Sequence, residues 1–124
     1  MPEYFIISNS NDLHRIMVNS IACVTSHGDY SDIHTCDGEK VTVTVQLGII
    51  EEMMDKQLGK DNQFVRIGRS LIANTRFVSY INPAKKRLTL SDGHTFKISF
   101  EVSKEALKGV KEDFEIKETE KKPG

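Results

Sequence analysis

The chain has 124 residues, of which 38% are hydrophobic and 28% charged, so its composition fits one globular domain and argues against wholesale disorder. Its apolar runs are far shorter than the ~20 residues of a membrane span, and its start has no basic leader of the signal-peptide kind. We therefore expect a cytoplasmic protein, whose two cysteines, Cys23 and Cys36, are reduced thiols.

The formal net charge of −1 hides an uneven distribution along the chain. Residues 1–59 carry nine acidic and three basic side chains, whereas residues 60–100 carry two acidic and eight basic ones. A basic segment of this kind can form a local positive surface on a nearly neutral protein. Taken alone, however, the charge favours a simpler interpretation, in which these are solvated basic side chains on one sheet.

The first strong turn signal in the chain predicts a β-hairpin. Asp37-Gly38 supplies the positive φ angles that a tight turn requires. After it, residues 41–45 alternate valine with threonine, which is the period-two pattern of a half-buried strand.

The next element breaks the β pattern and is predicted to be a helix. Acidic and basic residues separate four apolar residues at helical spacing, which are Leu47, Ile50, Met54 and Leu58. Gly59 follows where a C-terminal cap belongs. The pattern therefore predicts an amphipathic helix of about three turns, with its methionines packed in the core.

The second half of the chain returns to strands and turns. Residues 76–81 read as a strand that ends at an Asn82-Pro83 turn, and Asp92-Gly93 predicts a further hairpin. In the strand expected over residues 95–100, the inward positions are Phe96, Ile98 and Phe100.

The end of the chain combines a short helix with a charged tail. Ser103 is a good N-cap, and Val102 and Leu107 are spaced to form a hydrophobic staple. The mixed-charge residues 113–124 have little to bury, so we expect a disordered tail after a domain over residues 1–112.

Residue types that could carry catalysis or bind a metal are present, but their spacing fits no common site. The candidate zinc ligands are Cys23, His27, His34 and Cys36. Their order matches none of the usual zinc spacings. The chain has no Gly-x-Ser-x-Gly elbow around Ser70, no Gly-x-Gly-x-x-Gly motif and no Walker loop. We therefore expect no enzyme, no cofactor, no metal and no small-molecule substrate.

One segment, residues 64–74, stands out. Two apolar runs flank the polar interruption Gly68-Arg69-Ser70, so the flanks are expected in the core and Arg69 at an exposed bend. A guanidinium on a rigid protrusion suits bidentate contact with guanine O6 and N7, or with phosphate oxygens. On position alone, an ordinary surface arginine in a loop is the simpler interpretation.

This segment resembles the core motif of the LytTR DNA-binding family, which runs roughly Phe-x-Arg-x-His-Arg/Lys-Ser-x-x-Val-Asn. The matching residues are Phe64, Arg66, Arg69, Ser70 and Asn74. The similarity covers about residues 4 to 110, because other features follow in family order. These features are an apolar strand with a Gly-Asp-Tyr turn in residues 21–30, the Asp37-Gly38 hairpin, the helix over 47–58, the strand after the motif and the Asp92-Gly93 hairpin.

The resemblance implies a mainly β fold of short antiparallel β-sheets with one or two small helices, in which loops enter the DNA major groove. It implies base contacts from Arg69 and Ser31, and phosphate contacts from Ser70. It also implies that Arg66 supports the loop or touches the DNA backbone. Gly68 belongs to the same DNA-binding set, although it replaces the family's histidine and has no side chain to contact DNA.

Three departures from the family pattern keep a second interpretation open. Besides Gly68, the chain reads Ile98-Ser99-Phe100 and then Glu101 where the family often has Val-Ser-Arg with a DNA-contacting arginine. Asp29 and Asp32 also place negative charge on either side of Ser31.

The sequence thus predicts a transcriptional regulator that binds duplex DNA sequence-specifically. The alternative is a protein-interaction module that keeps a LytTR-like fold and has lost specific DNA recognition. The family usually carries this domain behind a receiver or another sensory module. A chain of 124 residues has no room for such a module, so we expect a stand-alone member. The family's use of paired half-sites implies a homodimer on DNA.

Overall fold

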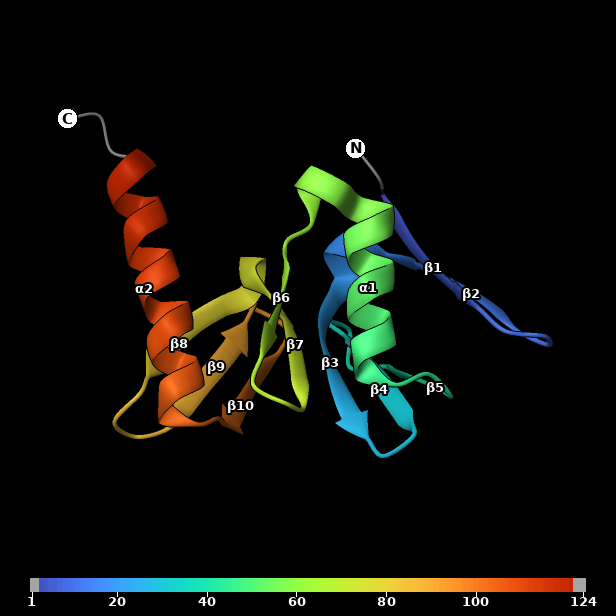
Figure 1. Cartoon of the computed structure of the whole chain (residues 1–124), viewed down its shortest axis with the longest axis horizontal. Coiled ribbons are helices and arrows are strands. Elements are labelled where there is room, and N and C mark those ends of the chain that lie inside the picture. Colours follow the sequence, from blue (N-terminus) through green and yellow to red (C-terminus); the bar gives the residue numbers. More distant parts are fainter. Residues whose placement is uncertain (1–2, 122–124) are drawn as a thin grey trace.

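The computed structural model describes residues 3–121, and the side chains of residues 3–116. Three antiparallel sheets are flanked by two α-helices (Figure 1). The elements are β1 (Tyr4–Ser8), β2 (Leu13–Met17), β3 (Ile21–His27), β4 (Tyr30–Thr35), β5 (Lys40–Val43), α1 (Leu47–Leu58), β6 (Phe64–Ile67), β7 (Leu71–Asn74), β8 (Val78–Asn82), β9 (Arg87–Ser91), β10 (Lys97–Glu101) and α2 (Lys104–Lys121). This architecture confirms the predicted mainly β class, with short antiparallel sheets and two helices.

The central sheet has five strands in the order β5-β4-β3-β7-β6. A hairpin, β1-β2, projects from one end of the molecule, and a three-stranded sheet, β10-β9-β8, lies on the other side of the central sheet (Figure 1). Strand β3 pairs with both β4 and β7, so it joins the first half of the chain to the motif segment.

Two hydrophobic cores lie on opposite sides of the central sheet. The first packs α1 and the β1-β2 hairpin against the sheet and includes Phe5, Ile33 and Ile50. The second packs the three-stranded sheet and α2 against it and includes Leu88 and Leu107. Because β3 contributes Val24 to one core and Cys23 to the other, the alternation of its side chains holds the two halves together.

Helix α1 has the bounds that the sequence predicts. Its four apolar residues at helical spacing are buried, as expected for an amphipathic helix on a core. Gly59 ends it with a φ of +55°, a left-handed conformation that favours glycine. One exposed residue of α1, Gln57, hydrogen-bonds the β1 strand: its side-chain amide accepts from Ile6 N–H at 2.9 Å and donates to Ile6 C=O at 2.7 Å.

The predicted turns are also present. Asp37-Gly38 joins β4 to β5, Asn82-Pro83 begins the β8–β9 turn, and Asp92-Gly93 joins β9 to β10. In the last of these, the Asp92 carboxylate accepts hydrogen bonds from the backbone N–H groups of His94 and Thr95. The hydroxyl of Thr95 and these N–H groups hold the pKa of Asp92 well below its usual range.

Several elements differ from the predictions. Strands β5 (Lys40–Val43) and β10 (Lys97–Glu101) lie where strands were expected over residues 41–45 and 95–100. The β1-β2 hairpin was not predicted, because its turn has no Asn-Gly or Asp-Gly pair. Instead, the side chain of Asn9 accepts hydrogen bonds from the N–H groups of Asn11 and Asp12. Strand β8 begins at Val78 rather than residue 76, because residues 75–77 form a 3₁₀ turn.

The helix at the end of the chain is longer than expected. Helix α2 begins after Ser103, whose hydroxyl accepts from Ala106 N–H at 3.3 Å, as the predicted N-cap requires. It continues to Lys121, so residues 113–121, expected to be disordered, are helical, and the last three residues lie outside the described range. Its added turns have apolar support, because Val110 is buried and Phe114 packs against the second core. Neither helix described is both long and apolar enough to cross a membrane.

Candidate functional site

The motif segment forms a hairpin whose loop displays the predicted residues together. Strands β6 and β7 pair Ile67 with Leu71, so the loop contains only Gly68, Arg69 and Ser70. All three are exposed. Gly68 has a φ of +73°, which a glycine adopts without strain. The apolar flanks therefore anchor the loop in the cores, as the sequence predicts.

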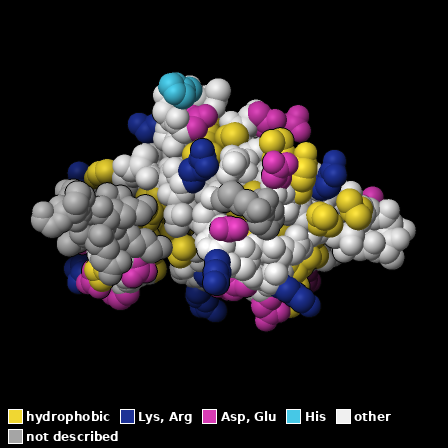
Figure 2. All heavy atoms as spheres, turned by 90° about the horizontal axis from the view of Figure 1, so that it is seen from above, with side chains coloured by type: hydrophobic (Ala, Val, Ile, Leu, Met, Phe, Trp, Pro, Cys, Tyr) yellow, Lys and Arg dark blue, Asp and Glu magenta, His cyan; other side chains and the backbone are white. Residues whose placement is uncertain are grey.

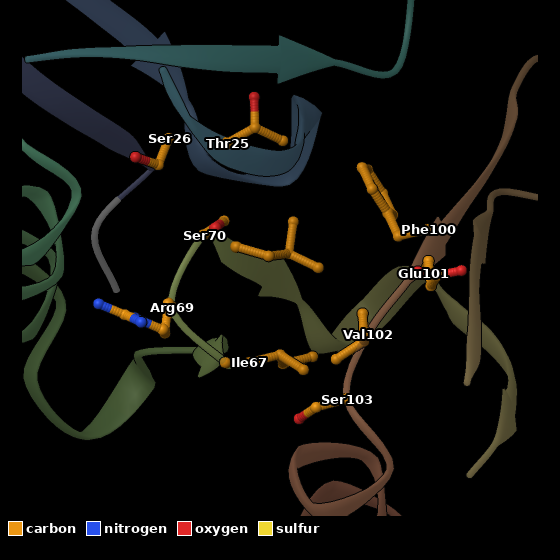
Figure 3. Close-up of a pocket in the computed structure, with 11 residues that line it drawn as sticks. Thr25, Ser26, Ile67, Arg69, Ser70, Phe100, Glu101, Val102 and Ser103 are labelled. Atoms are coloured by element: carbon orange, nitrogen blue, oxygen red, sulfur yellow. The ribbon is translucent and has the colours of Figure 1, made fainter. Parts of the chain in front are cut away.

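The backbone of this loop is held from two sides. Nη2 of Arg66 donates to the carbonyl oxygen of Arg69 at 2.8 Å. The backbone N–H of Ser26, at the end of β3, donates to the carbonyl oxygen of Ser70 at 2.9 Å. The main chain at Arg69 is thus fixed, while its side chain stands in solvent and points away from Phe100 and Val102 (Figure 3).

A groove of about 380 Å³ runs beside the loop, between it and the β10–α2 junction (Figure 3). Its apolar lining residues are Ile67, Leu71, Phe100 and Val102. Its polar and charged lining residues are Thr25, Ser26, Arg69, Ser70, Glu101 and Ser103. The lining therefore combines apolar carbons with hydrogen-bonding groups and charges of both signs.

Arg66 lies behind the loop rather than on its tip. Its Nη1 lies 3.0 Å from Oε1 of Glu51 on α1, and its side chain is 28% exposed. One guanidinium therefore joins a helix to the loop carbonyl. Of the two roles that the resemblance implies for Arg66, the geometry supports the structural one.

Ser31 is not part of this surface. It is fully buried, at 0% exposure, and its hydroxyl donates to the carbonyl oxygen of Val45 at 2.6 Å. Strand β4 turns Ser31 and Ile33 to the same buried side, toward the first core. The predicted base contact would require a hydroxyl that the fold encloses, so Ser31 is a structural residue.

The acidic residues around Ser31 differ in their surroundings. Asp29 lies in the exposed β3–β4 turn. Asp32 accepts a hydrogen bond from the hydroxyl of Thr42 at 2.6 Å, and this bond holds the pKa of Asp32 below its usual value. Asp32 therefore stays ionised on the sheet, next to β5.

The candidate metal ligands do not converge. Cys23 is buried in the second core, and burial raises the pKa of its thiol to about 12. Nε2 of His34 hydrogen-bonds Oγ1 of Thr25 at 2.9 Å. Across the residues that the structure describes, no three His, Cys, Asp or Glu side chains gather to hold a metal ion.

Basic residues lie close in the fold to the β10–α2 junction, which lines one side of the groove. The N–H of Val102 donates to the carbonyl oxygen of Lys86 at 3.0 Å. Arg87 of β9 lies opposite Glu101 of β10 in the strand register. The basic β8–β9 turn therefore lies against the start of α2, where Lys104 is exposed. On the face shown in Figure 2, basic and acidic side chains are interspersed and form no single large positive area.

Four residues of this site escape prediction from sequence: Thr25, Ser26 and Ser103 as lining residues of the groove, and Glu51 as the partner of Arg66. Their roles depend on the pairing of β3 with β7 and on the packing of α1 and α2. In the sequence, the position of Ser26 near the end of a predicted strand was the one sign that it could lie next to a loop.

The model of the LytTr DNA-binding domain family matches residues 11–115. The structure is similar to the LytTr DNA-binding domain of a methyl-accepting/DNA response regulator from Bacillus cereus, with 16% sequence identity and a TM-score of 0.61. That similarity covers 90% of this chain and 96% of the other, and it shows a shared fold. No curated protein sequence matches the chain.

Proposed function

Because the chain belongs to the LytTR DNA-binding domain family, which acts in transcription regulation and is not catalytic, we propose that it binds specific duplex DNA sequences as a transcriptional regulator. The observation that carries this proposal is the display of Arg69. Its backbone is held by Arg66 and by the neighbouring strand, and its side chain is exposed. Because the backbone that carries it is already held, only the side chain of Arg69 has to be ordered on binding.

Each residue of the loop has a proposed role. Arg69 donates to O6 and N7 of a guanine in the major groove, a bidentate contact that discriminates by about 1–3 kcal/mol. Ser70 donates to a phosphate oxygen, and Gly68 lets the backbone approach DNA closely. Arg66 acts from behind the loop, and Ser31 has no part in the interface.

The basic β8–β9 turn and the start of α2 supply the electrostatic part of the interface. Lys86 and Arg87 are joined to Val102 and Glu101 of the groove by a backbone hydrogen bond and by strand register, and Lys104 follows the lining residue Ser103. We propose that these three basic residues meet the phosphates that flank the bases read by Arg69. This role belongs in the cytoplasm, with a second copy of the chain on the other half of a paired site.

A second candidate is a protein-interaction module that has kept the fold and lost specific DNA recognition. The observation in its favour is the position of Glu101, an exposed acidic residue that lines the same groove as Arg69. A carboxylate there repels phosphate, and neighbouring Phe100 cannot replace the cation that the family often has.

Selection of random duplex DNA on the purified protein, at low and moderate salt, tests the proposal. We expect a defined motif to be enriched by the wild type and lost by Arg69→Ala. Arg76→Ala is a matched control, because Arg76 is an exposed arginine beyond the opposite end of β7. Salt-sensitive binding without any enriched motif would overturn the proposal and favour a protein partner.

A further inference from the structure

Arg66 of β6 links helix α1 to the loop of residues 68–70, called the recognition loop below. Nη1 of Arg66 is 3.0 Å from the Glu51 carboxylate, and Nη2 of the same guanidinium is 2.8 Å from the Arg69 carbonyl oxygen. The helix also approaches closely at its start, where a Cβ added to Gly48 would lie 3.9 Å from Nη1. The planar guanidinium makes both contacts at once because its nitrogens point in fixed, different directions.

The Glu51 contact decides where the guanidinium can lie. Arg66 is only partly buried, so without Glu51 its head group can swing toward solvent and leave the Arg69 carbonyl. The second support of the loop, the Ser26 N–H to the Ser70 carbonyl, is a backbone bond and does not depend on Glu51. Loss of Glu51 would therefore loosen the loop at Arg69 and leave its far end in place.

We propose that Glu51 is a positioning residue for DNA recognition: it orients Arg66, which fixes the backbone at Arg69 and so sets how sharply the protein discriminates between DNA sequences. The proposal rests on the function proposed above. Glu51 itself touches no DNA in this scheme. We expect Glu51 to affect sequence discrimination and not the free energy of unfolding, because a partly exposed ion pair contributes little to stability.

Because Glu51 is negatively charged, its substitution should affect specific and non-specific DNA binding differently. Removing a negative charge near the interface strengthens attraction to phosphate, so Glu51→Gln should not weaken non-specific binding. Glu52→Gln is the matched control, because it makes the same change of charge on an exposed residue next in the same helix. Arg66→Lys is a second test, because lysine keeps the charge but cannot make both contacts from one planar fork.

The experiment compares affinity for the selected duplex and for a scrambled duplex of the same composition, at one salt concentration. For Glu51→Gln and Arg66→Lys we expect the ratio of the two affinities to fall roughly tenfold, with an unchanged thermal midpoint. Glu52→Gln should leave the ratio unchanged. Equal ratios in Glu51→Gln and Glu52→Gln would overturn the proposal.

Amide ¹⁵N relaxation of the free protein separates this proposal from the proposed function. We expect the Arg69 and Ser70 amides to become more mobile in Glu51→Gln and not in Glu52→Gln. Equal mobility in the two variants would refute the positioning role, whatever the DNA measurements give. A wild type that selects no DNA motif would refute the function instead, and the relaxation data would still show whether Glu51 orders the loop.

Discussion

The backbone N–H of Ser26 donates to the carbonyl oxygen of Ser70 at 2.9 Å, and so ties the end of β3 to the recognition loop. Ser70 lies 44 positions after Ser26 in the chain. The bond continues the β3–β7 ladder past its last paired residues, Thr25 and Leu71. The hydrogen-bonding of the central sheet thus extends into the loop at Ser70.

A substitution that keeps the charge of Arg69 can separate base contact from phosphate attraction. We expect Arg69→Lys to lose about 1–3 kcal/mol of specific binding, because lysine cannot make the bidentate contact with guanine. Its affinity for non-specific DNA should stay near that of the wild type, since the charge remains. Titration of specific and scrambled duplexes checks this, and an equal loss on both would show that Arg69 meets phosphate instead of a base.

Ser31 should affect stability and not DNA binding. Ser31→Ala removes the hydroxyl that donates to the partly buried carbonyl of Val45, which should cost about 1 kcal/mol of unfolding free energy. Urea denaturation measures that cost, and DNA affinity of the folded protein should not change. A loss of affinity at unchanged stability would restore the base contact predicted from the sequence.

Asp92 predicts a dependence of stability on pH. Hydrogen bonds from Thr95 and backbone N–H groups lower its folded-state pKa below the usual value of about 3.9. A lowered pKa stabilises the fold above about pH 4, and this contribution is lost as the pH falls further. Asp92→Asn should therefore lower the thermal midpoint at pH 7, and its difference from the wild type should shrink toward pH 3.

Asp29→Asn serves as the control for that pH series, because it removes the same charge from another exposed turn. Its midpoint should follow the wild type across the range. A constant difference between Asp92→Asn and the wild type from pH 7 to pH 3 would contradict the prediction.

Two glycines should respond to alanine with opposite signs. Gly59 has a φ of +55°, so Gly59→Ala should cost about 1 kcal/mol of stability. Gly109 is exposed inside α2, where an added Cβ meets no atom within 4 Å, so Gly109→Ala should add about 0.5–1 kcal/mol. Chemical denaturation of both variants checks the pair, and destabilisation by Gly109→Ala would contradict the prediction.

Strong local patterns predicted much of the fold. Helix α1 could be predicted to the residue, because its apolar spacing and Gly59 act locally. The family resemblance is confirmed by the match over residues 11–115. The β1-β2 hairpin could not be predicted, since its outward face exposes Ile6, Leu13 and Met17 and so blurs the alternation of polarity.

The site was predictable only where it is contiguous in the chain. The motif brings Gly68, Arg69 and Ser70 together because they form one tight loop. The family resemblance predicts Ser31 on the DNA-binding surface. In the structure, the period of two that buries Ile33 also buries the side chain of Ser31. Glu51 had no local signal, because its contact with Arg66 depends on how α1 packs on the sheet.

The hydrogen bonds between Gln57 and Ile6 cover the outer edge of strand β1. The side-chain amide of Gln57 occupies both hydrogen-bonding groups of Ile6, the middle residue of β1, as a neighbouring strand would do. An incoming chain would have to break both bonds before it could add to that edge of the hairpin. The side chain thus protects the outer edge of β1 from self-association into extended aggregates, and it does so without burying any charge.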